Sequence, residues 1–600
     1  MKAKRIMALF CAAAITAGLL GGCGAPEGTT ESAQGSSGQQ DRTGEGASSG
    51  ESGAVSDDMS EHVTISIGGI NLGNSDTLEV WPSEVVQKLE DKFNITLVLK
   101  HYDNESLNLD LSGGTTCDIV QVNDDHIEGV LKGKHAVCLE DYKDTIASHI
   151  FSEKMSFRNG VMQEFKSNGE GKQYFVTPRV TFGDTEANYG TALNYGYVVR
   201  WDLYKAIGCP EINNDQDYID ALKAMKEIYP QTEEGLPVYA LSAYNDSQLH
   251  PYFFKGCLAE GYVNLEGGLY VQSVETNELL SDIYDAANPD VVTPFWSGVA
   301  FFNQLYREGL LDPDCLITKG EDLQDKYTKG QYIGGINGFY GGYNSRMQQE
   351  DPETLKQFVI LPAKLGWANE KNLAGWFGKY FFVSSHSPNV ERAVMVLDYL
   401  QSEEFSRDID SGVEGRWVKG ENGKPALTED TIAMKTDISR AQEWNQTGIR
   451  EGNMAAVCGE DYYNIAADGG RINLWFEEDI LPKSMNFVQK DMCETLDLTV
   501  PSDMLKKRVE AGKSIDLGTC MNVIQIALET TPKNIVRIDS NCEEITLNAL
   551  PGLVQAESEE EFAAAKQALL EELKGAGAEE SVAWWTEAWT KAKAEIESIQ

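Results

Sequence analysis

Apolar and polar residues alternate at the start of the part of the chain that can fold. Residues 63–67 read Val-Thr-Ile-Ser-Ile, which predicts a strand. A polar, glycine-containing loop is expected over 68–82, a helix over 83–93, and strands over 95–100 and 118–122. Strands that alternate with helices indicate parallel pairing in an open α/β sheet. The loops at the carboxyl ends of such strands surround a crevice where small molecules bind.

A second helical pattern lies further along the chain. Ile219, Leu222 and Met225 share one face of a predicted amphipathic helix. Either Asn214 or Asp215 is placed to cap the first turn of this helix.

The first residues have the layout of a secretory leader. Three basic residues stand within the first nine, an apolar run covers 6–20, and Gly21-Gly22 precede Cys23. This order predicts a signal peptide over 1–22, and the run is too short to span a bilayer. The pattern resembles the bacterial lipobox, which implies that Cys23 becomes the acylated first residue of the mature protein. A plain signal peptide or a chance match is the alternative.

Residues 23–60 hold almost only small and polar residues. Such a segment cannot bury enough apolar surface to fold, so a disordered tether is expected. The folded body would then lie outside the cytoplasm, lipid-anchored to the outer face of the bacterial cell membrane.

Composition limits the kinds of partner. The chain is 42% hydrophobic, and its net charge of −44 argues against nucleic acid or anionic headgroups. After the leader and tether, about 540 residues remain, enough for two or three domains. The eleven cysteines form no C-x-x-C pair, and the seven histidines form no H-E-x-x-H. We therefore identify no metal ligands and expect no cofactor, while the sequence leaves open whether a structural metal is bound and which cysteines form disulfides.

Several sequence blocks, in order, carry a family resemblance. They include "KFNITLVLKHY", "GGTTCDIVQVNDD" and "GKQYFVTP", the last of which looks like a crossing from one lobe to another at Pro178. "YTKGQYIGGINGFY", "FVILPAKLG" (a second crossing) and "GVEGRWVKGENGKPAL" follow. Together they resemble the extracellular solute-binding proteins of family 1, the maltose-binding type, which are lipoproteins of bacterial carbohydrate ABC importers. The likeness covers most of residues 61–430, although isoleucine replaces the family's leucine in "LYKAIG".

The resemblance implies a fold and a function. The fold is α/β, a two-lobed periplasmic-binding-protein-like fold of type II, with crossover strands between the lobes and a ligand cleft. Lobe 1 would comprise 61–177 and 363–403, and lobe 2 would comprise 178–362 and 404–600 with a C-terminal helical extension. A monomer of this kind closes over an oligosaccharide by a hinge and delivers it to the transmembrane subunits of an ABC permease.

Sugars present hydroxyl rims and apolar faces, so their sites combine aromatic plates with carboxylates, amides and guanidinium groups. The expected ligand-binding residues are Trp81, Asp125, Tyr195, Tyr197, Tyr340, Tyr343, Trp376, Glu414, Arg416 and Trp417. Asp124 is the alternative to Asp125, and Phe339 shares a loop with Tyr340. Competing structural roles are helix capping for Asp125, core packing for the tyrosines of the strand, and a salt bridge at a lobe edge for Arg416.

Other functions remain open at this point. The ligand could be a peptide or another non-sugar solute, or the protein could be a surface lipoprotein that tethers glycans for adhesion. A glycosidase needs only two carboxylates, but no G-x-S-x-G, phosphate loop or metal-ligand cluster occurs, so no catalytic residue is expected. Trp585 and Trp589 stand four residues apart on a terminal helix, a spacing typical of core packing.

Overall fold

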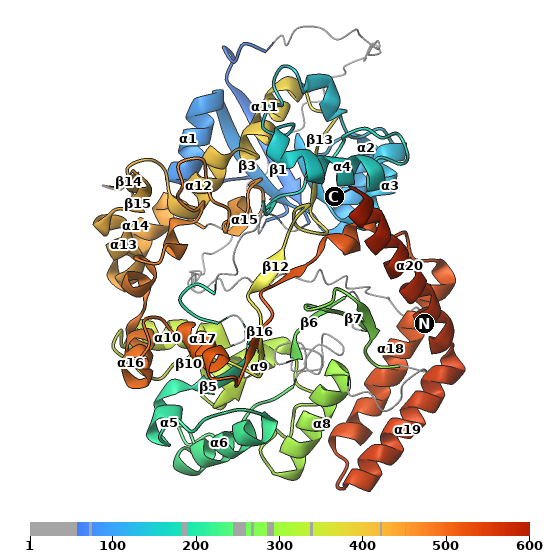
Figure 1. Ribbon diagram of the computed structural model, residues 1–600. Coiled ribbons are helices and arrows are strands. Elements are labelled where there is room, and N and C mark those ends of the chain that lie inside the picture. The colour runs from blue at the N-terminus through green and yellow to red at the C-terminus, as the bar shows by residue number, and fades with distance from the viewer. Residues whose placement is uncertain are drawn as a thin grey trace, which may run out of the picture.

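The computed structural model describes residues 57–599 except 71, 73–74, 183–188, 194, 244–259, 266–268, 285–292, 336–339, 421–422 and 451. The chain forms two α/β lobes, and a helical extension runs along one side of both (Figure 1). Cys23, the expected leader and most of the expected tether lie outside the described residues. None of the described helices is long and apolar enough to cross a bilayer.

Lobe 1 is built on a five-stranded sheet with the spatial order β13-β4-β1-β3-β2. As the alternation of strands and helices predicted, β1 pairs in parallel with both β3 and β4. β2 and β13 run antiparallel at the two edges. The strands are β1 (Val63–Gly69), β2 (Glu79–Val80), β3 (Ile95–His101), β4 (Ile119–Val122) and β13 (Tyr380–Val383).

Helices cover both faces of this sheet. Ile65 and Ile67 pack with α1, α11 and α12 on one face, whereas Val120 and Val122 pack with α2, α3 and α4 on the other. Ser83 caps α1 through a hydrogen bond from the Val86 amide at 3.2 Å. The lobe 1 helices are α1 (Glu84–Phe93), α2 (Asn104–Gly113), α3 (Asp124–Lys132), α4 (Ser156–Phe165), α11 (Val390–Leu400), α12 (Glu403–Ser411) and α15 (Gly452–Ala455), with 3-10 turns at Leu139–Tyr142 and Glu153–Met155.

Lobe 2 holds a smaller antiparallel sheet of order β10-β5-β9 and a second sheet of order β6-β7-β8. Asn214 is the cap of α6, because its Oδ1 accepts the Asp217 amide at 3.0 Å. The strands are β5 (Tyr197–Arg200), β6 (Tyr262–Asn264), β7 (Tyr270–Ser273), β8 (Leu279–Ser281), β9 (Gly334–Gly335) and β10 (Phe358–Leu361). The helices are α5 (Trp201–Ala206), α6 (Asp215–Ile228), α8 (Pro294–Arg307), α9 (Gly320–Thr328), α10 (Gly341–Glu350), α16 (Phe487–Leu496) and α17 (Asp503–Glu510).

The chain after residue 403 does not pass into lobe 2 where the sequence placed it. Phe405 and Ile409 of α12, with Met454 and Val457, belong to the hydrophobic core of lobe 1. The apolar face of α12 is buried there, which keeps this segment on lobe 1. The chain reaches lobe 2 only later, at α16, where Asp491 pairs with Lys205 at 2.7 Å.

A small helical unit lies beside α1 at the edge of lobe 1 (Figure 1). Its core combines Leu427, Ile432, Leu474, Trp475 and Ile480. The unit comprises β14 (Trp417–Lys419), β15 (Pro425–Leu427), α13 (Glu429–Thr436), α14 (Ala441–Thr447) and 3-10 turns at Ile438–Arg440, Leu474–Phe476 and Leu481–Ser484.

The C-terminal extension spans both lobes on one side (Figure 1). α20 packs against α4 of lobe 1 and β8 of lobe 2. Trp585 and Trp589 are buried in the main hydrophobic core, so the core role that their spacing predicted is confirmed. The extension comprises the 3-10 turn Val523–Ala527, α18 (Lys533–Val554), α19 (Glu559–Ala576) and α20 (Ala578–Ile599).

The first described residues pack on lobe 1, although the sequence placed them in the tether. The buried Arg392 of α11 donates to both carboxylate oxygens of Asp57, at 2.8 and 2.6 Å. Arg392 also donates to the carbonyl of Phe93 at 2.6 Å. This two-pronged pairing holds Asp57, which the sequence placed in the tether, against lobe 1.

Candidate functional site at the junction of the lobes

Paired crossing segments join the two lobes (Figure 1). β11 (Leu365–Gly366) pairs in parallel with β16 (Ile515–Asp516), and β12 (Asn369–Lys371) pairs with β17 (Thr519–Met521). In the segment after Pro178, where the sequence placed the first crossing, Val180 forms a parallel bridge with Glu460.

The carboxyl end of β4 faces this junction. β13 enters lobe 1 from the crossing strand β12, and its first residue, Tyr380, pairs with Val122, the last residue of β4. The Tyr380 hydroxyl donates to Asp124 at 3.0 Å, and Lys166 binds the same carboxylate at 2.5 Å. Asp124 is therefore occupied by structural partners, whereas the side chain of Asp125 is exposed.

Amide and carboxyl groups from three crossing segments meet in a buried network. Nδ2 of Asn522 donates to Asn372, whose own Nδ2 lies 3.4 Å from Asp461. The amide of Asn372 donates to Thr181 Oγ1 at 3.0 Å. Oδ1 of Asn522 is buried without a hydrogen-bond partner among the described residues. The network ties the crossings to one another, so their relative movement would change it.

The carboxyl group of Asp461 should make the stability of the protein depend on pH. Burial raises its pKa from 3.8 to about 6, although the Tyr463 amide and Arg179 partly offset this. Because this pKa is higher in the folded than in the unfolded state, the contribution of Asp461 to stability is fully present below pH 4 and is lost as the pH rises through 6. Asp461→Asn should remove that decline, worth up to about 1.4 kcal/mol per pH unit. Urea unfolding of both proteins between pH 4 and 7 measures it, and parallel curves would contradict it.

A stacked aromatic pair lies where lobe 2 meets the crossings. The rings of Tyr195 and Trp367 are 4.0 Å apart at 15°. They pack with Val263, Leu517 and Cys520, which come from β6 and the β16–β17 segment. Trp367 is 4% exposed, and its Nε1 has no hydrogen-bond partner among the described residues, whereas Tyr195 is half-buried. Sequence reasoning selected Tyr195 but missed Trp367, although it directly follows the recognised crossing "FVILPAKLG".

A second stacked pair lies on the lobe 1 side. Tyr463 and Phe476 are 5.2 Å apart at 14°. Gly190, at the start of lobe 2, lies so close that a Cβ there would meet the Phe476 ring at 3.0 Å. These aromatics were missed because the family resemblance ended near residue 430. The dense aromatic and acidic spacing of "EDYYN" and "NLWFEED" was the signal available.

Three of the expected tyrosines are packed within lobe 2. Tyr197 is buried, and its hydroxyl donates to Asp215 at 2.9 Å. Tyr340 and Tyr343 pack on Phe358 with ring centroids 5.5 and 5.4 Å away, and burial raises the pKa of each to about 12. Phe339 lies outside the described residues.

The two expected tryptophans of lobe 1 are half-buried. Trp81 and Trp376 both pack on the lobe 1 core that includes α1 and α11. The amide of Trp376 donates to the Pro178 carbonyl at 2.9 Å, which holds Trp376 next to the first crossing. Nζ of Lys379 lies 4.4 Å from the centre of its ring.

The expected charged loop after residue 412 lies at the edge of lobe 1. Nε of Arg416 donates to Glu84 of α1 at 2.8 Å, so this guanidinium is used in a salt bridge. Nε1 of Trp417 donates to the Gly412 carbonyl at 3.0 Å. Glu414 is exposed. Arg416 and Trp417 are thus engaged within the loop and with α1.

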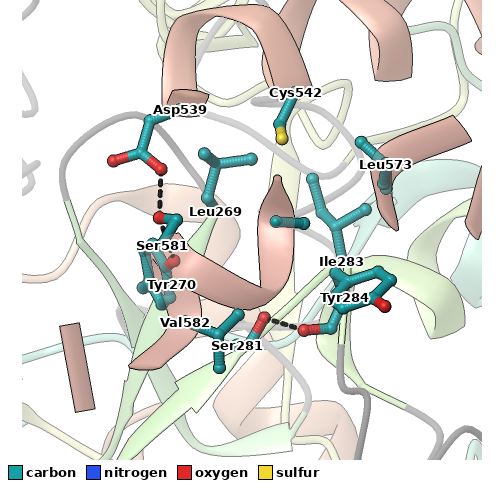
Figure 2. Close-up of a pocket in the computed structure, with 11 residues that line it drawn as sticks. Leu269, Tyr270, Ser281, Ile283, Tyr284, Asp539, Cys542, Leu573, Ser581 and Val582 are labelled. Carbon is teal, nitrogen blue, oxygen red and sulfur yellow. Dashed lines mark hydrogen bonds between the residues drawn. The ribbon is translucent and has the colours of Figure 1, made fainter. Parts of the chain in front are cut away.

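The cavity shown in Figure 2 lies between the β7–β8 hairpin and the terminal helices. It has a volume of about 20 Å³ for a water-sized sphere, which suits one water and no sugar. Tyr270 and Asp539 both bond to Ser581 at its rim. Among the described residues, no group of three or more His, Cys, Asp or Glu is arranged to hold a metal ion.

Solved structures of bacterial solute-binding proteins resemble nearly the whole chain. An HMO-binding, ABC-transporter-associated protein of Bifidobacterium longum infantis is 12% identical, with a TM-score of 0.51 over 88% of this chain and 98% of its own. The Streptococcus pneumoniae substrate-binding protein FusA, in complex with kestose, is 14% identical, with a TM-score of 0.52 over 89% and 100%. The alginate-binding protein AlgQ2 is 14% identical, with a TM-score of 0.52 over 88% and 98%.

These likenesses show the fold. The chain has the two-lobed α/β fold of periplasmic binding proteins, so the expected fold class is confirmed. No sequence profile of a known protein family matches the chain, and no curated protein sequence matches it.

Proposed function

We propose that the protein captures an extracellular carbohydrate between its lobes and delivers it to an ABC-type permease. The main support is the fold, which it shares over nearly its whole length with binding proteins named for HMO, alginate and N-glycan and with one in complex with kestose. The Tyr195–Trp367 stack adds an aromatic platform at the junction, of the kind that packs against the apolar face of a sugar ring.

The exposed and half-buried candidates could each contribute a different contact to the ligand. Tyr195 and Trp376 offer ring faces beside the crossings, while the carboxylates of Asp125 and Glu414 can accept hydrogen bonds from sugar hydroxyls. Trp81 adds a further half-buried ring. Tyr197, Tyr340 and Tyr343 support the lobe 2 wall from within, and Arg416 and Trp417 hold the edge of lobe 1.

A permease would recognise the closed conformation of the protein. A ligand that contacts both lobes binds the closed form more tightly and shifts the population toward it. The network of Asn372, Asn522 and Asp461 lies where the segments must flex. The proposal also includes cleavage of the signal peptide before Cys23 and acylation of Cys23. The folded body would then be a monomer held outside the cytoplasm. Binding without turnover is the proposed activity.

Thermal unfolding with a panel of mono- and oligosaccharides tests the proposal. A ligand at about 100 times its dissociation constant adds ~2.7 kcal/mol to the native state, so the melting temperature should rise with one glycan class. A rise in melting temperature with peptides or another solute alone would contradict the proposal of a carbohydrate ligand. Chromatography of the recovered ligand tests the absence of turnover, because a glycosidase would return shortened sugar.

Tyr195→Ala should weaken binding of the glycan that this panel identifies by about tenfold or more, equivalent to at least ~1.4 kcal/mol. The substitution removes the half-buried ring of the stack and leaves Trp367 without its 4.0 Å partner. Isothermal titration calorimetry measures the change. Tyr195→Phe keeps the ring and should retain most of the affinity, and equal losses in both variants would argue against stacking.

A further inference from the structure

Two histidines face each other on the surface of lobe 1. Nδ1 of His135 lies 3.2 Å from Nε2 of His386, and the ring planes meet at 48°. His386 is exposed and His135 is half-buried. A neutral imidazole is the form that binds metal ions.

The backbone holds the two histidines side by side. Residues 135–137 pair antiparallel with residues 383–385 through a bridge between Ala136 and Ser384. The Ser385 amide donates to the His135 carbonyl at 2.7 Å, and the Val137 amide donates to Val383 at 2.9 Å. The pair is therefore set by main-chain bonds between two segments.

Two helices end at this pair. The amide of His135 donates at 2.9 Å to Val130 in the last turn of α3. The His386 ring packs on Gly114, which ends α2, and a Cβ on Gly114 would lie 3.3 Å from Nδ1 of His386. Helix C-termini carry partial negative charge and favour cations, and the net charge of −44 attracts cations to the molecule as a whole.

We propose that His135 and His386 form a two-imidazole site for a divalent transition-metal ion such as Zn²⁺ or Ni²⁺. Metal–nitrogen bonds of about 2.0–2.1 Å at a tetrahedral angle place two nitrogens about 3.3 Å apart, close to the spacing observed here. A small rotation of each ring turns both lone pairs toward one ion. Water or a donor from another molecule fills the other positions, because no third His, Cys, Asp or Glu joins the pair among the described residues.

The lysine side chains near the two histidines do not prevent a cation from binding. The closest lysine in the sequence, Lys134, is exposed, and Lys132 pairs with Glu128 on α3. The Lys134 carbonyl accepts a 2.8 Å hydrogen bond from Ser385, which fixes the loop. Because the Lys134 side chain is long and exposed, its ammonium group can move away from a bound cation.

The site lies at the far end of lobe 1 from the junction. Val383, the last residue of β13, pairs with Ile119, the first residue of β4. His386 follows at this amino-terminal end of β4, whereas the proposed sugar site lies at its carboxyl end. Metal binding here is independent of the proposed function.

Isothermal titration of untagged full-length protein with NiCl₂ tests the site. We expect one Ni²⁺ per chain. His135→Gln and His386→Gln should each weaken binding by at least about tenfold, since even the loss of a group that only orients a metal ligand costs 10–100-fold. His62→Gln is the control, because His62 is exposed and bonds to Asn94 and Thr96 instead of another histidine.

Two results would overturn the site. One is Ni²⁺ binding by correctly folded His135→Gln and His386→Gln proteins that matches the wild type. The other is wild-type binding no tighter than that of the double variant. Circular dichroism and melting temperature establish folding. A glycan-induced rise in melting temperature should be the same in all these proteins, which separates failure of the metal site from failure of the proposed sugar site.

Discussion

Arg179→Met should lower the free energy of unfolding by about 3–5 kcal/mol. Arg179 is 2% exposed and directly follows Pro178, and its guanidinium donates through both Nη groups to Asp410. The Asp410 side chain is fully buried. Methionine keeps much of the apolar volume but leaves the carboxylate without a counter-charge, which is costly in a buried site.

Guanidinium chloride unfolding measures this loss. Lys132→Met is the matched control, because its pair with Glu128 is solvent-exposed and should contribute no more than about 0.5 kcal/mol. Arg179→Met combined with Asp410→Leu removes both charges and should recover much of the stability. A loss below about 1 kcal/mol in the single variant would contradict a role for this pair in anchoring the crossing.

Gly375→Ala should destabilise the protein by about 2–4 kcal/mol. Gly375 has a φ of +81°, a region in which an L side chain is strained. A Cβ there would also lie 2.4 Å from Oγ1 of Thr177 and 2.6 Å from the Pro178 carbonyl. The added methyl group would push the segment that carries Trp376 away from the first crossing. The midpoint of thermal unfolding reports the change.

Gly378→Ala separates the two causes of this effect. Gly378 has a similar φ of +72°, but a Cβ there would meet nothing within 4 Å. Its substitution should therefore show only the conformational cost, about 1–2 kcal/mol. Equal losses at the two glycines would mean that the close approach of Gly375 to Thr177 and Pro178 adds no cost beyond the backbone strain.

Local patterns predicted the elements of lobe 1 well. The alternation over residues 63–67 and the helix expected over 83–93 rest on short-range signals that no distant contact overrides. In lobe 2, the structure selects Asn214 over Asp215 as the cap of α6. The crossing placed at Pro178 stays a prediction from the family resemblance, and a proline suits it because it restricts both its own backbone and that of the residue before it.

Long-range packing decided the features that the sequence did not predict. The amphipathic α12 could have packed on either lobe, and only contacts with lobe 1 strands hundreds of residues earlier settle its place. Tyr197 and Tyr195 look alike in sequence, yet one hydroxyl is held by Asp215 and the other ring stacks on Trp367. Which face of a tyrosine is buried depends on partners that no local pattern identifies.

Small-angle X-ray scattering with and without saturating oligosaccharide tests the central claim most directly. Ligand capture between two hinged lobes predicts that the radius of gyration falls as the sugar saturates the protein, because closure brings the lobes together. An unchanged scattering profile at a sugar concentration that saturates binding in calorimetry would contradict capture by closure.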